Sequence, residues 1–168
     1  AVMNEAVFVG FDTESKPTFF KDAAQNGPHV VQIAVDNEAF IVQVRSNTPS
    51  AFLKALVESE RIVKIGFGLT SDRAPLARKL GLKLNTTVDL SKTLRSLGYK
   101  QELGVKAAVA IVLGQNIQKS KKVTTSNWAN AALSASQLLY AANDAYAALK
   151  VFQAMGSPYV APGSGRSA

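Results

Sequence analysis

Two carboxylates, two residues apart, end an apolar segment near the start of the chain. The sequence VFVGFDTES, residues 7–15, has the character of a buried β-strand up to Phe11 and then presents Asp12 and Glu14. Because strand side chains alternate between faces, both acids point the same way, with Cα atoms roughly 6.6 Å apart. Burying either acid without a partner costs several kcal/mol. A cation bound between the two acids would explain the pair, and so would a strand that simply ends in a solvated turn, which is the commoner explanation of an isolated D-x-E.

Another acid lies inside a strongly apolar helical segment. In LLYAANDAYAALKVF, residues 138–152, almost every residue is apolar or alanine, yet Asp144 stands in the middle. Tyr140 precedes it by four residues, so in a helix the two side chains share one face. The pattern fits an acid and a hydroxyl that act together. It fits equally well an Asp at a solvated helix edge beside a Tyr in the core.

A further acid follows a pair of glycines. Asp72 comes after Gly66 and Gly68, between a predicted strand and a predicted helix, where glycine lets the backbone turn tightly or approach a ligand. The same glycines, with Asp89 at the end of the next strand, are similar to the fingerprint of an NAD-binding oxidoreductase. However, Ser71 replaces the third glycine, and a carboxylate would stand where the helix N-terminus should meet a pyrophosphate. The oxidoreductase alternative is therefore disfavoured.

Composition limits the class of protein. The chain has 168 residues, of which 47% are hydrophobic, enough for one well-packed domain. We assign this domain to residues 1–156 and expect residues 157–168, rich in Gly, Ser and Pro, to be a disordered tail. The absence of cysteine favours a reducing compartment, and no apolar segment reaches the length of a membrane span. The sequence predicts a soluble cytoplasmic protein without a membrane partner, whose N-terminus has been trimmed or processed.

Positive charge is concentrated in the middle of the chain. The net charge is +7, and residues 61–122 carry thirteen Lys and Arg against three acids. Residues 1–60 are net negative, with four basic and eight acidic side chains. A clustered excess of Lys and Arg attracts polyanions by releasing their counterions, so nucleic acid is the leading candidate partner. A basic surface that serves only solubility is the alternative.

The order of predicted elements is that of an α/β protein. Three strands come first, and the short polar step Asn37-Glu38 between the second and third suggests a hairpin, so we expect these strands to be antiparallel. Ser134 and Gln137 form a capping box for the last helix, which Gly156 ends. The predicted strands are residues 6–13, 29–36, 39–44, 61–67 and 85–90, and the predicted helices are 49–60, 71–82, 91–98, 102–114 and 134–156.

The three acidic segments together resemble a known family. FDTE, KIGFGLTSD and YAANDAYAAL, in this order along the chain, are similar to the three motifs of the DEDD (DnaQ-like) superfamily of 3′-to-5′ exonucleases, in the subclass with tyrosine in the third motif. The chain also resembles ribonuclease D and the exonuclease domain of the Werner syndrome helicase. The resemblance includes HVVQIAV, TVDL and SNWANAALSASQLLYAANDAY and covers almost the whole chain. It implies a ribonuclease-H-like fold: a mixed five-stranded sheet, its first three strands antiparallel, flanked by α-helices.

The resemblance also implies an activity and a set of site residues. Asp12, Glu14, Asp72 and Asp144 would hold two divalent cations, Mg²⁺ or Mn²⁺, with Asp12 bridging both. Tyr140 would orient or help deprotonate the attacking water. The product would be a nucleoside 5′-monophosphate released from the free 3′ end of DNA or RNA. A catalytically silent nucleic-acid-binding module on the same fold is the alternative, and the four acids argue against it.

A basic segment precedes the last helix. In QNIQKSKKVTTSNW, residues 115–128, we expect Lys119, Lys121 and Lys122 to form a mobile loop that holds backbone phosphates, with a merely solvated loop as the alternative. Trp128 is predicted to belong to the core. Relatives often carry a large residue after the D-x-E pair, to wedge against the terminal base, and Ser15 stands there in this chain. His29, the only histidine, does not match the catalytic histidine of the sister subclass and is predicted to be a structural or surface residue. The DNA or RNA preference and the oligomeric state stay open.

Overall fold

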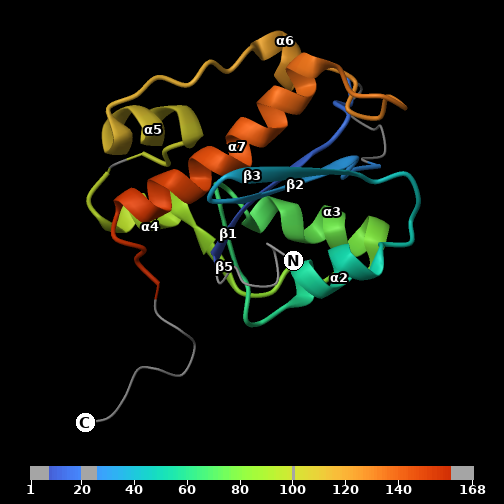
Figure 1. Cartoon of the computed structure of the whole chain (residues 1–168), viewed down its shortest axis with the longest axis horizontal. Coiled ribbons are helices and arrows are strands. Elements are labelled where there is room, and N and C mark those ends of the chain that lie inside the picture. Colours follow the sequence, from blue (N-terminus) through green and yellow to red (C-terminus); the bar gives the residue numbers. More distant parts are fainter. Residues whose placement is uncertain (1–7, 20–25, 100, 160–168) are drawn as a thin grey trace.

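A mixed five-stranded sheet with helices on both faces forms the core of the molecule (Figure 1). A computed structural model describes residues 8–19, 26–99 and 101–159. The strand order is β3-β2-β1-β4-β5. The strands are β1 (Phe8–Glu14), β2 (Val30–Val35), β3 (Glu38–Gln43), β4 (Val63–Gly66) and β5 (Thr87–Asp89). The helices are α2 (Ala51–Glu58), α3 (Thr70–Leu80), α4 (Leu90–Ser96), α5 (Val105–Leu113), α6 (Lys121–Thr124) and α7 (Ala135–Ala154).

The pairing of the strands confirms the predicted topology. β1 pairs with β2 and β2 with β3 in antiparallel orientation, whereas β4 pairs with β1 and β5 with β4 in parallel. Asp36 and Asn37 form the hairpin turn between β2 and β3, and Glu38 already pairs with Val35. The turn therefore lies one residue before the predicted step. The central position of β1 explains its apolar sequence, because it is covered on both faces.

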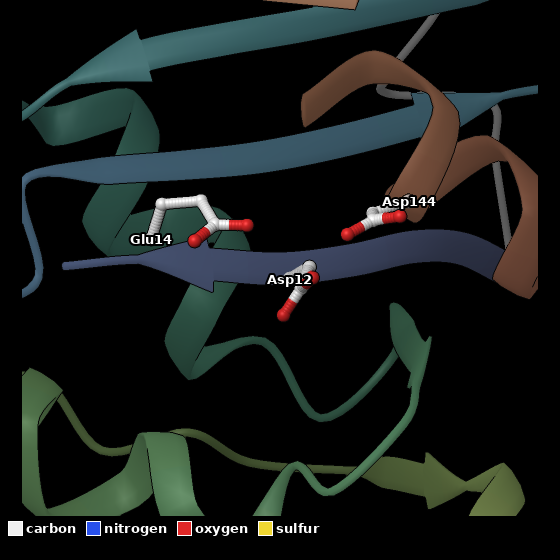
Figure 2. Close-up of side chains that lie close together, drawn as sticks. All are labelled: Asp12, Glu14 and Asp144. Atoms are coloured by element: carbon white, nitrogen blue, oxygen red, sulfur yellow. The ribbon is translucent and has the colours of Figure 1, made fainter. Parts of the chain in front are cut away.

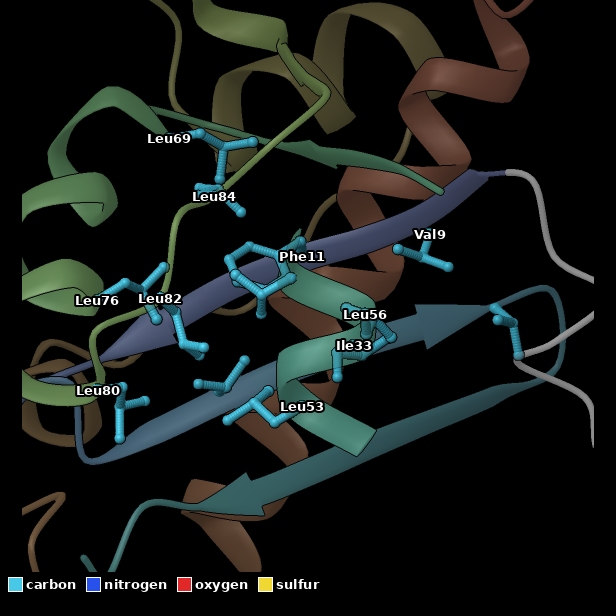
Figure 3. Packing of buried hydrophobic residues seen from close by; sticks show 13 residues of the cluster. Val9, Phe11, Ile33, Leu53, Leu56, Leu69, Leu76, Leu80, Leu82 and Leu84 are labelled. Atoms are coloured by element: carbon cyan, nitrogen blue, oxygen red, sulfur yellow. The ribbon is translucent and has the colours of Figure 1, made fainter. Parts of the chain in front are cut away.

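Two apolar layers cover the two faces of the sheet. On one face Phe11 and Ile33 pack with Leu53 of α2 and Leu76 of α3, as Figure 3 shows. On the other face α4, α5 and α7 cover the strands, and Ile65 and Phe152 belong to that second cluster. The alternation of side chains along β1 thus sends Phe11 into one layer and leaves Asp12 on the side of α7. The acid site forms on the α7 side of the sheet.

Helix α7 lies unusually close to the first strand. A Cβ added at Gly10 would stand 1.9 Å from the carbonyl oxygen of Ala145, so only glycine fits at that point of β1. Ala141, Ala145 and Ala148 are buried on the same side of the helix. Because small side chains let the helix backbone approach the strand, the position of α7 over β1 is set by backbone contact. This contact fixes where the residues of α7 stand relative to Asp12.

Most predicted helix ends agree with the structure. The Ser134 hydroxyl accepts a hydrogen bond from the Gln137 backbone N–H at 3.2 Å, and the Gln137 side-chain oxygen Oε1 accepts one from the Ser134 backbone N–H at 3.0 Å. This confirms the predicted capping box. Ser50 caps α2, and Gly81 ends α3 with a left-handed φ of 63°. Gly156, with φ of 79°, directly follows the C-cap of α7.

The basic segment before α7 is partly helical, which corrects the predicted mobile loop. Helix α6 begins after Ser120, whose carbonyl accepts hydrogen bonds from the backbone N–H groups of Val123 and Thr124, both at 3.0 Å. The Trp128 indole then donates to the Thr124 carbonyl at 3.2 Å. Trp128 is fully buried, as predicted. These bonds give the lysine-rich segment a defined course over α7.

The last described residues leave α7 along the sheet. Tyr159 packs edge-on against Phe8, with ring centroids 5.8 Å apart. The remainder of the predicted tail, residues 160–168, lies outside the described residues, as do residues 1–7. None of the helices in the described part of the chain is long and apolar enough to cross a membrane.

Candidate metal centre

Three of the four predicted acids converge at one point of the sheet. Asp12 and Glu14 of β1 and Asp144 of α7 each offer a carboxylate oxygen, and these atoms lie within 4.8 Å of one another. Figure 2 shows the three side chains converging over β1. Asp12 and Glu14 share a strand face, and the close approach of α7 brings Asp144 to the same face. We call these three side chains the acid site.

The fourth acid, Asp72, reaches β1 from the other side. It lies in the first turn of α3, is almost fully buried, and accepts a short hydrogen bond from the Thr13 hydroxyl. Thr13 stands between the two acids of β1 and points to the opposite face. Asp72 therefore does not belong to the group of three in this structure, but Thr13 holds it against the same strand. This role of Thr13 could not be predicted from the chain alone, because a threonine inside a strand is ordinary.

The glycine pair before α3 serves this arrangement. A Cβ at Gly66 would stand 2.4 Å from the Phe11 carbonyl oxygen, so glycine lets β4 end close to β1. Gly68 has a left-handed φ of 68° and donates its N–H to Asp89 at 2.9 Å. The Asp89 carboxylate also caps α4. A dinucleotide-binding site would need the Asp89 carboxylate to bind its ligand. In this fold that carboxylate already accepts hydrogen bonds from the backbone of the protein.

A lysine side chain supplies positive charge at the acid site. The Lys119 ammonium lies 2.6 Å from Asp144 Oδ2, and the side chains are 25% and 4% exposed, respectively. The same ammonium stands 4.8 Å from the centre of the Tyr140 ring. Lys119 therefore contacts a predicted metal ligand and the predicted catalytic tyrosine together. Sequence reasoning grouped it with Lys121 and Lys122, which are exposed on α6.

Tyr140 is held on the rim of the acid site. Its ring packs against Trp128, with centroids 5.8 Å apart, and its hydroxyl is 2.8 Å from the Thr124 hydroxyl. It lies one helical turn before Asp144, as the four-residue spacing predicts. The buried ring fits a tyrosine of the core, and the hydroxyl fits a group that acts together with Asp144. These are the two roles that the sequence left open. Thr124, which fixes the hydroxyl, was not foreseen.

The acids are crowded and poorly solvated. Burial, together with the charges of Asp72, Glu14 and Asp144, raises the pKa of Asp12 well above its ordinary value. Burial and the Asp144 charge raise the pKa of Glu14 to about 8, against an opposing effect of Lys119. Burial raises the pKa of Asp72 to about 6 and also raises that of Asp144. Such shifts mean that burial and mutual repulsion disfavour the charged forms of these carboxylates, and that Lys119 does not offset this effect.

The donor set fits hard divalent cations. Every ligand that the acid site offers is a carboxylate oxygen, which Mg²⁺ and Mn²⁺ prefer. The chain has no cysteine and a single histidine, which argues against zinc. A divalent cation would also supply the positive charge that the raised pKa values call for.

One buried polar side chain beside the acid site was missed by sequence reasoning. Gln32 of β2 stands directly opposite Asp12 and is fully buried, yet its amide oxygen and nitrogen have no hydrogen-bond partner among the described residues. The signal was present in HVVQIAV, where a lone amide interrupts an apolar strand. Unpaired buried polar groups are costly and rare, so Gln32 needs an explanation that the described residues do not supply.

Ser15, which departs from the family pattern, and His29 both make contacts within the fold. Ser15 packs against the loop before β2, since a Cβ at Gly27 would stand 1.9 Å from the Ser15 hydroxyl. His29 accepts a hydrogen bond at Nδ1 from the Lys16 backbone N–H at 3.1 Å. Its own backbone N–H donates to the Glu14 carbonyl at 2.8 Å. The bonds of His29 agree with the structural role predicted for it.

Comparison with known proteins gives one consistent family. The family model described as 3′-5′ exonuclease matches residues 1–158. The bifunctional 3′-5′ exonuclease/ATP-dependent helicase WRN of Mus musculus is 32% identical over 159 residues, covering 92% of this chain and 11% of the relative. A 3′-5′ exonuclease of Arabidopsis thaliana is 29% identical, covering 88% of this chain and 52% of the relative. The chain thus spans about half or less of these relatives.

Solved structures share the fold at lower sequence identity. The crystal structure of Trypanosoma brucei RNase D in complex with RNA U12 matches with a TM-score of 0.79 and 22% identity, covering 95% of this chain and 59% of that one. Escherichia coli RNase D matches with a TM-score of 0.77 and 18% identity, covering 93% of this chain and 40% of that one. These matches confirm the predicted ribonuclease-H-like fold.

Proposed function

The chain belongs to the 3′-5′ exonuclease family, and on this premise we propose that it removes nucleotides one at a time from the 3′ end of a nucleic-acid strand. The substrate would be DNA or RNA with a free 3′ end, and the product a nucleoside 5′-monophosphate. The observation that carries the proposal is the convergence of Asp12, Glu14 and Asp144 within 4.8 Å. Acids brought together from the first strand and the last helix, with raised pKa values, are what a divalent-cation site requires.

The four acids divide between two cation positions. Glu14 and Asp144 would hold the cation on the side of the attacking water, Asp72 would hold the other, and Asp12 would contribute to both. Two such cations make a water nucleophilic and stabilise the departing oxygen. Thr13 fixes the Asp72 carboxylate by its hydrogen bond and thereby orients the ligand on the second side.

The remaining groups of the site place the water and its protons. The water oxygen forms a bond to phosphorus while the bond from phosphorus to the 3′ oxygen breaks, and that oxygen takes a proton from solvent. The Tyr140 hydroxyl, already fixed by Thr124, would orient the attacking water or help to pass its proton on to solvent. Lys119 keeps Asp144 in place before the cations bind and stays close to Tyr140.

Replacing Asp12 tests the proposed cation site. Asp12→Ala removes the acid common to both cation positions, so we expect nucleotide release to fall to background while strand binding stays measurable. The assay measures release of mononucleotides from 3′-labelled DNA and RNA strands, with Mn²⁺ and with chelator. Glu60→Ala removes an exposed acid elsewhere and is the matched control. Full activity of Asp12→Ala would refute the cation site. A wild-type chain that binds strands without cation-dependent release would instead be the silent binding module.

A further inference from the structure

Gln32 is a buried polar side chain whose hydrogen bonding the fold leaves open. It is 0% exposed, and neither its amide oxygen nor its amide nitrogen has a hydrogen-bond partner among the described residues. Nearly all buried amides in proteins are paired, because an unpaired amide loses its bonds to water and gains nothing in return. An unpaired amide at this depth favours a partner that becomes available when the protein binds a ligand.

The register of the sheet places Gln32 directly beside the acid site. Gln32 of β2 stands opposite Asp12 of β1, and residues opposite each other in a sheet project from the same face, with Cβ atoms about 4.5 to 5.5 Å apart. Val30, two residues earlier on the same face of β2, belongs to one apolar cluster with Tyr140 of α7. Gln32 thus lies on the α7 side of the sheet, where Asp12 meets Asp144 (Figure 2).

One of the two cross-strand neighbours of Gln32 can accept a hydrogen bond. Ile41, opposite it on β3, has an apolar side chain, whereas Asp12, opposite it on β1, has a carboxylate. The terminal torsion of a glutamine side chain is broad, so the amide can turn toward Asp12 without movement of the strand. The pairing of the strands makes Asp12 the acid best placed to accept the amide N–H.

The Asp12 carboxylate has room for one more hydrogen bond. An ionised carboxylate has about four lone-pair sites on its two oxygens. One oxygen of Asp12 accepts the backbone N–H of Thr13 at 2.8 Å. Under the proposed function two further sites bind the two cations, which leaves one site for a donor. An amide is a neutral donor, so it lacks the positive charge with which Lys119 opposes a cation.

We propose that Gln32 is a positioning residue, whose amide N–H donates to the Asp12 carboxylate when the acid site holds its cations. The inference rests on the proposed function, because that function makes Asp12 the ligand common to both cations. The bond fixes the orientation of this shared carboxylate. Outer hydrogen-bond partners of metal ligands commonly act in this way, and their loss costs about 10- to 100-fold in metal affinity or activity.

The test makes the same substitution at two buried glutamines. Gln32→Met keeps an unbranched side chain and removes the unpaired amide. Gln137→Met, the matched control, removes an amide that is paired through both its oxygen and its nitrogen, with Ser134, Ser126 and Asn127. Calorimetric titration measures Mn²⁺ affinity without substrate, and thermal unfolding in chelator measures the Tm of the cation-free protein.

The two variants should differ in opposite ways from the wild type. Gln32→Met should weaken Mn²⁺ binding about 10- to 100-fold. Its Tm in chelator should equal or exceed that of the wild type, because an apolar group of similar shape replaces an unpaired polar one. Gln137→Met should lower the Tm, because it breaks hydrogen bonds that the fold uses, and should leave Mn²⁺ affinity unchanged.

Further measurements guard against a packing defect. Gln32→Leu, a second apolar variant, should reproduce the loss of Mn²⁺ affinity. In the cleavage assay, the Mn²⁺ concentration that gives half of the maximal rate should rise by the same factor as the dissociation constant. Unchanged Mn²⁺ affinity in Gln32→Met would overturn the proposal and assign the amide to a buried water. So would weaker Mn²⁺ binding together with a lower Tm in chelator, since these two results describe a structural role.

Failure of this proposal is distinct from failure of the proposed function. A wild-type chain that binds Mn²⁺ and loses this binding in Asp12→Ala, yet releases no nucleotides, would refute the proposed function. The comparison of Mn²⁺ affinities at Gln32 would still stand in that case, because calorimetry needs no turnover. A wild-type chain that binds no Mn²⁺ would overturn both.

Discussion

At the scale of single residues, Lys119 is the group whose role differs most from what its sequence context suggests. It stands in a run of lysines, yet its ammonium is bound to Asp144 and covers the Tyr140 ring. Its pKa is raised because, although burial lowers it, Asp144 and the Tyr140 hydroxyl favour the charged form. It therefore acts as an internal counterion for one of three acids. Asp12 and Glu14 have no comparable partner among the described residues.

Removing the Lys119 charge should strengthen cation binding. Lys119→Met keeps the length and the apolar stem of the side chain, but it removes a positive charge that repels a cation and competes for Asp144. Two unit charges about 4 Å apart interact by about 1 kcal/mol in a water-like medium, which corresponds to about a fivefold change in affinity. Calorimetric titration of Mn²⁺ without substrate measures the change. Lys122→Met, on the exposed surface of α6, is the control. Weaker Mn²⁺ binding by Lys119→Met would show that Lys119 supports the site through structure instead.

The hydroxyl of Tyr140 can be separated from its ring. Tyr140→Phe keeps the packing against Trp128 and removes only the oxygen. If this oxygen holds the attacking water, the single-turnover rate should fall by roughly 10²- to 10⁴-fold, with cation affinity nearly unchanged because the acids are intact. Tyr146→Phe, on the same helix but more exposed, should retain the wild-type rate. A wild-type rate for Tyr140→Phe would mean that Tyr140 serves packing alone.

At the scale of secondary-structure elements, the contact between β1 and α7 decides the geometry of the acid site. Gly10→Ala would place a methyl group 1.9 Å from the Ala145 carbonyl oxygen, and backbone cannot move away as a side chain can. We expect a loss of about 3 kcal/mol or more and a fall in Tm of roughly 6 °C or more. Gly104→Ala is the control, because nothing lies within 4 Å of an added Cβ there. Thermal unfolding followed by circular dichroism measures both. Equal Tm values would show that α7 can shift without cost.

Elements with strong local signals were predictable from the sequence. The capping box of Ser134 and Gln137, the cap at Ser50 and the left-handed Gly81 are interactions within a few residues, so they can be read along the chain. Helix α6 was missed because its lysines and threonines give no apolar period. Its course depends on the hydrogen bond from Trp128, a contact that only the folded chain provides.

At the scale of the whole molecule, sequence reasoning reached the acids but not their surroundings. Asp12, Glu14 and Asp144 were identified because family motifs mark them, and the structure brings the three together. The Lys119 ion pair with Asp144 and the Thr13 bond to Asp72 join segments far apart in the chain. Such contacts leave no periodic pattern in the sequence, so they become visible only in three dimensions.

The stability of the whole molecule should fall as pH rises, which is the opposite of what acids with lowered pKa values produce. The folded chain has pKa values of about 8 for Glu14 and about 6 for Asp72, above those of ordinary acids. Between about pH 4.5 and 8 the folded state therefore binds more protons than the unfolded state, and stability falls as pH rises. The Tm of the cation-free protein should be higher at pH 5 than at pH 8.

Cations should reverse this dependence. Saturating Mn²⁺ binds the deprotonated acids, so it should raise the Tm more at pH 8 than at pH 5, and a cation at 100 times its Kd adds about 2.7 kcal/mol. Asp12→Asn/Glu14→Gln removes two of the titrating groups and should flatten the pH dependence of the cation-free protein. A Tm that rises from pH 5 to pH 8 without cations would contradict the raised pKa values.

The contact between Gly10 and Ala145 also bears on how the protein is made. The two residues are 135 positions apart, and Asp12 and Glu14 follow Gly10 in β1 while Asp144 directly precedes Ala145 in α7. A ribosome that adds about 5 to 20 residues per second needs roughly 7 to 27 s to pass from one to the other. Throughout that interval the growing chain carries Asp12 and Glu14 but lacks Asp144. The nascent chain therefore emerges without a complete acid site, and it can acquire the cations only after its last long helix has been synthesised and has docked on the sheet.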